Sequence, residues 1–223
     1  MKNTKLELEG HDSEQIQMME EECILVDKED KIIGKDSKVN CHLGDGMLHR
    51  AFSVLLFNSA GELLIQKRAK EKITFPSIWA NSCCSHPLHI QSEIDGINGA
   101  KRAAKRKMEQ ELGIDPEQID IEKLHYITKM RYKARADDTW VEYEIDYIFA
   151  MKRDVEINPN KIEIEETKYV NQNELELIFN DSKAKIGPWF KLIKENFLND
   201  IWKSIDSLES AGDNSLHHMG ECK

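Results

Sequence analysis

The feature that most restricts the fold is a run of strict alternation at residues 141–147, VEYEIDY. Successive side chains of an extended strand point to opposite faces, so Glu142, Glu144 and Asp146 share one face. By itself this pattern is typical of an edge strand with a solvated face. Three neighbouring carboxylates repel one another unless water or a cation screens them. A bound metal ion would turn that repulsion into attraction.

Histidines that could complete a metal site occur in turn-rich stretches. His42 and His49 flank a glycine-containing loop, and His86 follows two cysteines in NSCCSHP, residues 81–87. Three imidazoles and two carboxylates suit a borderline divalent ion such as zinc, manganese or iron. The spacing matches no standard zinc-finger pattern, and a lone histidine is usually structural or on the surface. Spacing alone therefore leaves the metal site open.

The vicinal pair Cys83 and Cys84 has two interpretations. Free cysteines are usually small buried hydrophobic residues. A thiol beside a bound cation can instead have a lowered pKa and exchange protons. The chain has five cysteines, an odd number, and its N-terminal sequence is not a secretory signal, which argues against a disulfide framework.

A helix is predicted over residues 98–112, where good helix formers precede Gly113 at the expected C-terminal cap. The helix carries a cluster of cations, Lys101, Arg102, Lys105, Arg106 and Lys107. Like charges four residues apart destabilise an isolated helix by about 0.2–0.5 kcal/mol per pair. The basic face is either simply solvated or binds an anion such as phosphate. Glu111 can hold Mg²⁺, which bridges carboxylate and phosphate oxygens.

The remaining elements suggest one α/β domain. Strands are predicted over residues 23–27, 51–57, 62–68, 123–134 and 139–151, and further helices over 171–179 and 187–207. Strands flanked by helices without regular alternation favour an α+β fold or an α/β/α sandwich. We expect a flexible segment over residues 1–20, a single domain over 21–208 and a disordered tail over 209–223.

Charge and targeting signals narrow the function classes. The net charge of -10 over 223 residues argues against nucleic-acid binding. No apolar run approaches the roughly 18 residues that span a bilayer, so no membrane insertion is expected. The termini contain no clear address; the cytosol is the expected compartment and the peroxisome the alternative.

Five blocks, in order, carry a family resemblance: NCH with LHRAFS (residues 40–42 and 48–53), ITFP (73–76), NSCCSHPL (81–88), ELG (111–113) and EYEIDY (142–147). Together they resemble type I isopentenyl-diphosphate isomerases of the Nudix superfamily, most closely the eukaryotic branch. The likeness runs from about residue 22 to 197. It implies a Nudix-type α/β/α sandwich with a mixed sheet and extra terminal helices.

The resemblance also implies roles for individual residues. The expected ligands of a divalent metal, zinc or manganese, are His42, His49, His86, Glu142 and Glu144. The expected catalytic residues are Cys84, Glu144 and Tyr132. Glu111 matches the ligand of Mg²⁺, together with the backbone carbonyl of Cys84. The expected substrate contacts are Lys38, Arg68, Lys72, Arg106 and Lys107 for the diphosphate and Trp189 for the hydrocarbon.

The activity implied by the resemblance is interconversion of isopentenyl and dimethylallyl diphosphate in isoprenoid biosynthesis, by a monomer or homodimer. Two alternatives remain. One is a Nudix pyrophosphohydrolase, which the helix disfavours because Lys107 follows Arg106 and Gln110 precedes Glu111, leaving one carboxylate of the usual acidic set. The other is a binding module with a structural zinc ion, which would normally have four ligands and favour cysteine.

Overall fold

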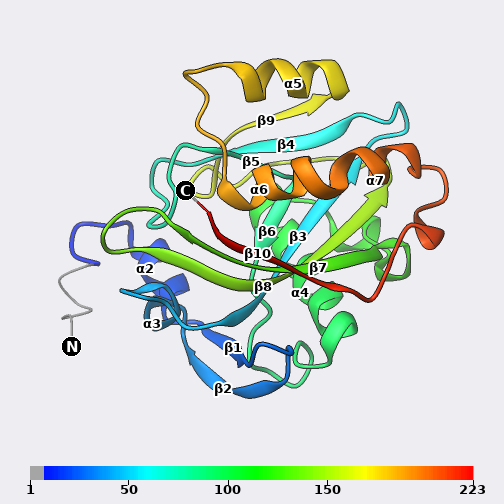
Figure 1. Ribbon diagram of the computed structural model, residues 1–223. Coiled ribbons are helices and arrows are strands. Elements are labelled where there is room, and N and C mark those ends of the chain that lie inside the picture. The colour runs from blue at the N-terminus through cyan, green and yellow to red at the C-terminus, as the bar shows by residue number, and fades with distance from the viewer. Residues whose placement is uncertain (1–7, 223) are drawn as a thin grey trace.

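The computed structural model describes residues 8–222, whose strands form one mixed sheet (Figure 1). The strands are β1 (Glu22–Val26), β2 (Ile32–Ser37), β3 (His49–Phe57), β4 (Leu63–Arg68), β5 (Trp79–Ala80), β6 (Cys83–Ser85), β7 (His125–Arg135), β8 (Val141–Lys152), β9 (Ile164–Val170) and β10 (Leu216–Cys222). The helices are α2 (Ser13–Met19), α3 (Lys38–His42), α4 (Gly96–Leu112), α5 (Gln172–Asn180), α6 (Pro188–Ile193) and α7 (Asn199–Lys203). A π-helical segment, Lys194–Leu198, joins α6 to α7, and short 3-10 turns occur at Pro116–Gln118, Ile121–Lys123 and Leu208–Ser210.

The strand β8 lies in the middle of the sheet rather than at its edge. The main path through the sheet is β10-β7-β8-β3-β1-β2, while β4 joins β3 to β5 and β9, and β6 pairs with β3. β8 runs parallel to β3 and antiparallel to β7. The mixed sheet confirms the predicted α/β class. β8 therefore has a hydrogen-bonded neighbour along each edge, and the carboxylates on its face, Glu142, Glu144 and Asp146, are all buried rather than solvated.

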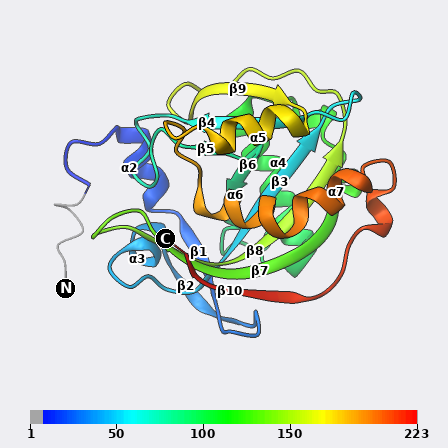
Figure 2. The same cartoon turned by 45° about the horizontal axis from the view of Figure 1, so that its top comes forward.

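The alternation of β3 divides the core into two layers. Phe52, Val54 and Leu56 pack in one apolar cluster with the alanines of α4, whereas Leu55 and Phe57 pack in a second cluster with α6 and α7. The helices α6 and α7 lie in front of the sheet and α4 lies behind it (Figures 1 and 2). The sheet is thus sandwiched between helices, as a strand that is buried on both faces requires.

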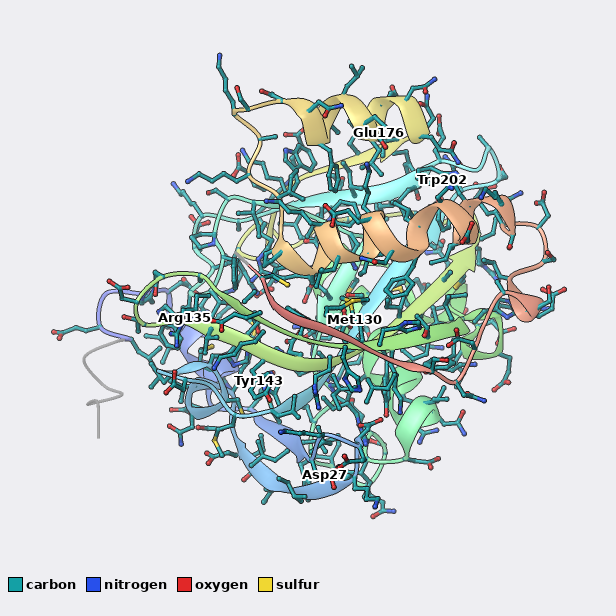
Figure 3. The ribbon with its side chains drawn as sticks, in the orientation of Figure 1. Asp27, Met130, Arg135, Tyr143, Glu176 and Trp202 are labelled. Carbon is teal, nitrogen blue, oxygen red and sulfur yellow. The ribbon has the colours of Figure 1, made fainter. Side chains whose placement is uncertain are left out.

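Two helices are fastened to the sheet by identifiable contacts. The predicted helix over 98–112 is confirmed as α4, and Gly113 caps it in the left-handed conformation, with φ 63°. On the other side, the Trp202 ring packs edge-on against Phe57 at 5.4 Å, and its indole nitrogen donates to the Gly61 carbonyl at 2.8 Å (Figure 3). The Trp202 contacts fix α7 relative to β3, and α4 is held against β3 by its alanines, which pack in the same cluster as Phe52 and Val54.

The structure differs from the sequence expectation at both ends of the chain. Within the segment expected to be flexible, residues 13–19 form α2, whose N-terminus is capped by the Asp12 side chain; residues 1–7 lie outside the described part. The tail expected to be disordered contains β10, which pairs in parallel with β7. Polar composition suggested disorder in both segments. Buried side chains, Gln15 and Met19, order α2, and backbone pairing with β7 orders β10.

Several short elements were not predicted. The stretch 35–48, for which no helix or strand was predicted, contains the end of β2 and the helix α3, and β5, β6 and β9 were also missed. These elements are short and lack a clear period, so local pattern could not reveal them. None of the helices in residues 8–222 is long and apolar enough to cross a lipid bilayer.

Candidate active site

The register of the sheet gathers the predicted site around Glu144. In β3, His49 lies beside Glu144 of β8, and in β7, Tyr132 lies across from it. Tyr132 donates its hydroxyl hydrogen to Glu144 Oε2 at 2.5 Å. The sheet therefore holds an imidazole and a phenol on either side of one buried carboxylate.

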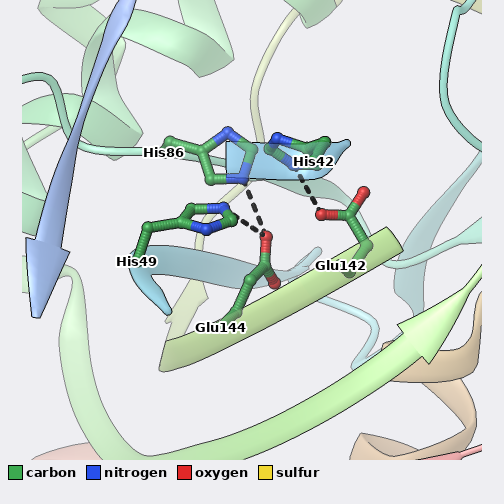
Figure 4. Close-up of side chains that lie close together, drawn as sticks. All are labelled: His42, His49, His86, Glu142 and Glu144. Carbon is green, nitrogen blue, oxygen red and sulfur yellow. Dashed lines mark hydrogen bonds and ion pairs between the residues drawn. The ribbon is translucent and has the colours of Figure 1, made fainter. Parts of the chain in front are cut away.

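Five side chains that the sequence predicted as metal ligands form one cluster (Figure 4). They are His42, His49, His86, Glu142 and Glu144, and their potential ligand atoms all lie within 4.8 Å of one another. They come from α3, β3, β8 and the residue that follows β6. All five are buried. Such a compact set of nitrogen and oxygen donors can hold a divalent metal ion.

The histidine tautomers favour metal binding. His42 Nδ1 lies 2.7 Å from the Lys38 carbonyl, and His49 Nδ1 lies 2.7 Å from the Met47 carbonyl. A carbonyl only accepts hydrogen bonds, so each Nδ1 carries a hydrogen, and when the ring is neutral its Nε2 presents a lone pair to the cluster. Both Nε2 atoms are buried and have no well-aligned hydrogen bond. The nitrogen and oxygen atoms of the cluster are therefore better placed to bind a metal ion than to form hydrogen bonds with one another.

The charges of the cluster are strongly coupled. Burial opposes protonation of His49, but Glu144 outweighs it and raises the pKa of His49 to about 9. Burial, reinforced by His49, lowers the pKa of His86 well below its usual value. Burial alone would raise the pKa of Glu144, but His49 and Tyr132 bring it below the usual value. Glu144 is consequently an ionised carboxylate near neutral pH.

A pocket opens beside the cluster and collects most of the predicted site residues. Those that line it are Lys38, Arg68, Lys72, Cys84, His86, Glu111, Tyr132, Glu142, Glu144 and Trp189. The indole nitrogen of Trp189 donates to Asn81 Oδ1 at 3.0 Å, which fixes the ring. The pocket thus combines an aromatic face, a thiol, carboxylates and cations, a combination suited to an anionic ligand with an apolar part.

The two adjacent cysteines lie in different surroundings. Cys83 is fully buried in the apolar cluster with α4, and its thiol lies 3.8 Å from Glu111 Oε2. Cys84 is half-buried and lines the pocket. Burial raises the pKa of the Cys84 thiol to about 12, so in these surroundings it is a protonated thiol. β6 pairs Cys84 with Ser53 of β3, which sets this thiol beside the site.

The predicted diphosphate contacts separate into two groups. Lys38, Arg68 and Lys72 line the pocket, and the Arg68 guanidinium donates to the carbonyls of Phe75 and Thr74 at 2.9 and 2.8 Å. The other two predicted contacts, Arg106 and Lys107, do not line this pocket.

Those two α4 cations are held by carboxylates. Arg106 donates to both oxygens of Glu93, at 2.7 and 2.9 Å. Lys107 pairs with Glu111 at 3.3 Å and is almost completely buried. Because Glu111 itself lines the pocket, Lys107 acts on the site through Glu111, whereas Arg106 is engaged with the loop that precedes α4.

Three residues that support the site were missed by sequence reasoning. Glu163 accepts from Lys72 at 2.6 Å, Glu93 holds Arg106, and Asn81 holds Trp189. Asn81 belongs to the NSCCSHPL block and could have been noticed there. The two glutamates carry no local signal, because their partners lie far away in the sequence.

Comparison with known proteins shows the family to which the chain belongs. The NUDIX domain family matches residues 47–190. Isopentenyl-diphosphate delta-isomerase of Gibberella zeae is 51% identical and covers 90% of this chain and 83% of its own length. Isopentenyl-diphosphate Delta-isomerase 1 of Mus musculus is 43% identical, over 93% of this chain and 95% of its own length. Isopentenyl-diphosphate Delta-isomerase I, chloroplastic, of Arabidopsis thaliana is 42% identical, over 91% of this chain and 75% of its own length.

Solved structures support the fold alone. DR0079 from Deinococcus radiodurans aligns with a TM-score of 0.58 at 16% identity, over 79% of this chain and 99% of its own. A NUDIX hydrolase from Alicyclobacillus acidocaldarius aligns with a TM-score of 0.53 at 9% identity, over 73% and 96%. The fold, the match over 90% or more of the chain and the identity of 42–51% to curated enzymes lead to one conclusion: this chain belongs to the isopentenyl-diphosphate delta-isomerase family, on the NUDIX fold.

Proposed function

We propose that the chain interconverts isopentenyl diphosphate and dimethylallyl diphosphate by adding one proton and removing another. The observation that carries the proposal is the pocket itself, in which a protonated thiol, Cys84, and an ionised carboxylate, Glu144, accompany Trp189 and three cations. Moving a double bond requires two groups that exchange protons with adjacent carbons. Titratable groups whose surroundings push their pKa values apart are suited to that work.

The diphosphate is proposed to bind to Lys38, Arg68 and Lys72, which supply positive charge on the pocket wall. Glu111 and the Cys84 carbonyl would hold Mg²⁺, which would supply positive charge to offset part of the charge of the diphosphate. Anchoring the charged end fixes the reacting carbons relative to the thiol and the carboxylate.

Isomerisation adds one proton to the substrate and removes another. In the forward direction one group adds a proton to the terminal methylene carbon, which becomes a methyl group and leaves a tertiary carbocation. The second group takes a proton from the carbon on the diphosphate side, which restores a double bond. Cys84 and Glu144 are the proposed pair, and Tyr132 orients Glu144 through its 2.5 Å hydrogen bond. In the reverse direction the two groups exchange roles.

The carbocation requires protection. The Trp189 face can stabilise a cation electrostatically, and its indole is fixed by Asn81. Water must be excluded, because it would capture the cation as an alcohol. His42, His49, His86, Glu142 and Glu144 would hold zinc or manganese, which would supply positive charge beside the Glu144 carboxylate.

The direct test is incubation of the holoenzyme with isopentenyl diphosphate and Mg²⁺ in D₂O. Formation of dimethylallyl diphosphate with deuterium in a methyl group is the expected result. Nucleoside diphosphates should be tested in parallel. If these release phosphate while isopentenyl diphosphate stays unchanged, the chain is a hydrolase and the proposal is wrong.

Two isosteric variants separate the acidic roles. Glu144→Gln keeps the pocket shape but removes the base, so turnover should collapse while substrate still binds. Glu111→Gln weakens Mg²⁺, so added Mg²⁺ should partly restore activity. Metal content must be measured in both, because Glu144 also belongs to the histidine cluster. Normal turnover of a fully metallated Glu144→Gln enzyme would contradict the acid/base role.

A further inference from the structure

A continuous chain of contacts joins the N-terminal helix α2 to a lysine of the pocket. Gln15 of α2 is 3% exposed, and its side-chain amide donates to Glu163 Oε1 at 2.5 Å and to the Ile162 carbonyl at 3.2 Å. Glu163 is also 3% exposed, and its other oxygen, Oε2, accepts from Lys72 Nζ at 2.6 Å. One buried carboxylate is thus shared between a helix outside the pocket and a cation on its wall.

The backbone around Lys72 depends on the same glutamate. The Ala69 amide donates to the Glu163 carbonyl at 3.0 Å, and the Lys72 amide donates to the Ala69 carbonyl at 3.3 Å. The segment that carries Lys72 is therefore fixed to residue 163 by its backbone as well as by its side chain. A displacement of Glu163 would be transmitted to Lys72 by both routes.

The helix α2 has a second attachment, to the other pocket lysine. Met19 lies one turn after Gln15, hence on the same side of the helix, and it packs with Val39 and Ile73, the residues next to Lys38 and Lys72. Immediately after α2, the Glu21 carbonyl accepts from the Lys38 amide at 2.7 Å. The helix therefore contacts the immediate neighbours of both lysines.

We infer that α2 is a positioning element for the diphosphate site, and that Gln15 is a positioning residue that acts on Lys72 through Glu163. The inference rests on the proposed function, because it takes Lys72 to be a contact of the substrate's diphosphate. Gln15 does not line the pocket and needs no contact with the substrate.

The charges around Glu163 predict that loss of the Gln15 amide weakens diphosphate binding. With Gln15 present, the Glu163 carboxylate is held by two donors from opposite sides. Without the amide, the carboxylate is free to rotate, and Lys72 becomes its main remaining partner. A lysine that is more tightly paired and less well placed has less attraction for an incoming diphosphate. Both effects weaken binding of the anion.

The test compares Gln15→Leu with Gln17→Leu, the same substitution at an exposed position of the same helix. Calorimetric titration with inorganic diphosphate and Mg²⁺ should give a dissociation constant raised about fivefold to tenfold in Gln15→Leu, somewhat less than the loss of a direct charged hydrogen bond would give. KM for isopentenyl diphosphate should rise in parallel, with kcat within about twofold of wild type. Gln17→Leu should match wild type.

A double-mutant cycle tests whether Gln15 acts on diphosphate binding through Lys72. In a Lys72→Met background, Gln15→Leu should not weaken diphosphate binding further, because the lysine through which it acts is gone. A full additional loss in that background would overturn the inference, and so would an unchanged dissociation constant in Gln15→Leu alone. Should Gln15→Leu fail to fold, Gln15→Asn, which keeps the amide but shortens its reach, is measured against the same criteria.

These outcomes are separable from those of the proposed function. Binding of inorganic diphosphate involves no proton transfer, so it reports on Lys72 whether or not the chain isomerises its substrate. If wild type forms dimethylallyl diphosphate while Gln15→Leu binds diphosphate normally, only the role of Gln15 is wrong. If Gln15→Leu weakens diphosphate binding but wild type forms no product, only the isomerase proposal is wrong.

Discussion

The adjacent residues Cys83 and Cys84 lie in different surroundings, one in the apolar core and the other in the pocket wall. Consecutive side chains of β6 point to opposite faces, which sends Cys83 into the apolar core and Cys84 to the pocket. Cys84→Ala should lower kcat by about a thousandfold, within the range for loss of a proton-transfer group. Cys83→Ala should leave most of the activity and lower the free energy of unfolding by about 1 kcal/mol.

Steady-state rates and thermal unfolding of the two alanine variants check this prediction. Equal loss of activity in both, accompanied by unfolding, would leave no distinct role for Cys84. The comparison is well matched because the two changes remove the same atoms from neighbouring positions.

Lys72 should make diphosphate binding sensitive to alkaline pH. Burial, only partly offset by Glu163, lowers the pKa of Lys72 from 10.5 to about 8. Above pH 8 the folded protein loses this charge, so its affinity for diphosphate should fall. The unfolded chain keeps the proton up to about pH 10.5, so between these values the contribution of Lys72 to the free energy of unfolding should rise with pH. Binding and stability therefore move in opposite directions.

Lys72→Arg provides the control, because a guanidinium stays charged throughout this range. Dissociation constants for inorganic diphosphate at pH 7 and pH 9 should diverge more in wild type than in Lys72→Arg. The same pH dependence in both proteins would show that another group is responsible.

At the scale of single elements, α4 brings Glu111 to the site and depends on a close approach at Gly99. A Cβ at this position would lie 2.2 Å from the Glu93 carbonyl oxygen, which belongs to the backbone. Alanine normally stabilises a helix interior by up to about 1 kcal/mol relative to glycine, but overpacking of this kind costs about 1–3 kcal/mol. Gly99→Ala should therefore lower the free energy of unfolding and shift α4.

The shift should also raise the Mg²⁺ concentration needed for activity, because α4 carries Glu111, the proposed Mg²⁺ ligand. Chemical denaturation and Mg²⁺ titration measure the two effects. Gly34→Ala is the control, since a Cβ there meets nothing within 4 Å, and its effect should stay within about 0.5 kcal/mol. A Gly99→Ala protein as stable as this control would show that the loop before α4 moves freely.

At the scale of the whole molecule, the five-residue cluster links distant parts of the chain, so metal binding should stabilise the entire fold. Its ligands span residues 42 to 144. An ion present at a thousandfold excess over its dissociation constant adds about 4 kcal/mol to the free energy of unfolding. For a protein of this size each kilocalorie corresponds to about 2–4 °C in Tm, so chelation should lower Tm by about 8–16 °C.

Differential scanning calorimetry with and without chelator tests this, with metal content measured alongside. His49→Ala should abolish most of the metal-dependent shift, whereas His11→Ala, at an exposed position, should keep it. A chelated protein that loses its metal but not its Tm would show that the cluster does not link these segments energetically.

The sequence by itself determined the features that depend on local periodicity. The alternation over 141–147 set the carboxylates of β8 on one face, and helix formers followed by Gly113 defined α4. The family resemblance identified the five cluster residues, and the structure places them together. Local patterns succeed here because side-chain direction within one strand or helix follows from spacing alone.

Only the tertiary structure decided which charges meet. Arg106 and Lys107 were both expected at the diphosphate, yet one pairs with Glu93 and the other with Glu111. Lys72 contacts Glu163, 91 residues away, and β10 pairs with β7, where Leu216 lies beside Lys129, 87 residues earlier in the chain. An ion pair or a strand pairing between distant segments depends on distances that the fold creates. It depends also on burial, which removes water as a competing partner. The spacing of neighbouring residues encodes neither the distances nor the burial.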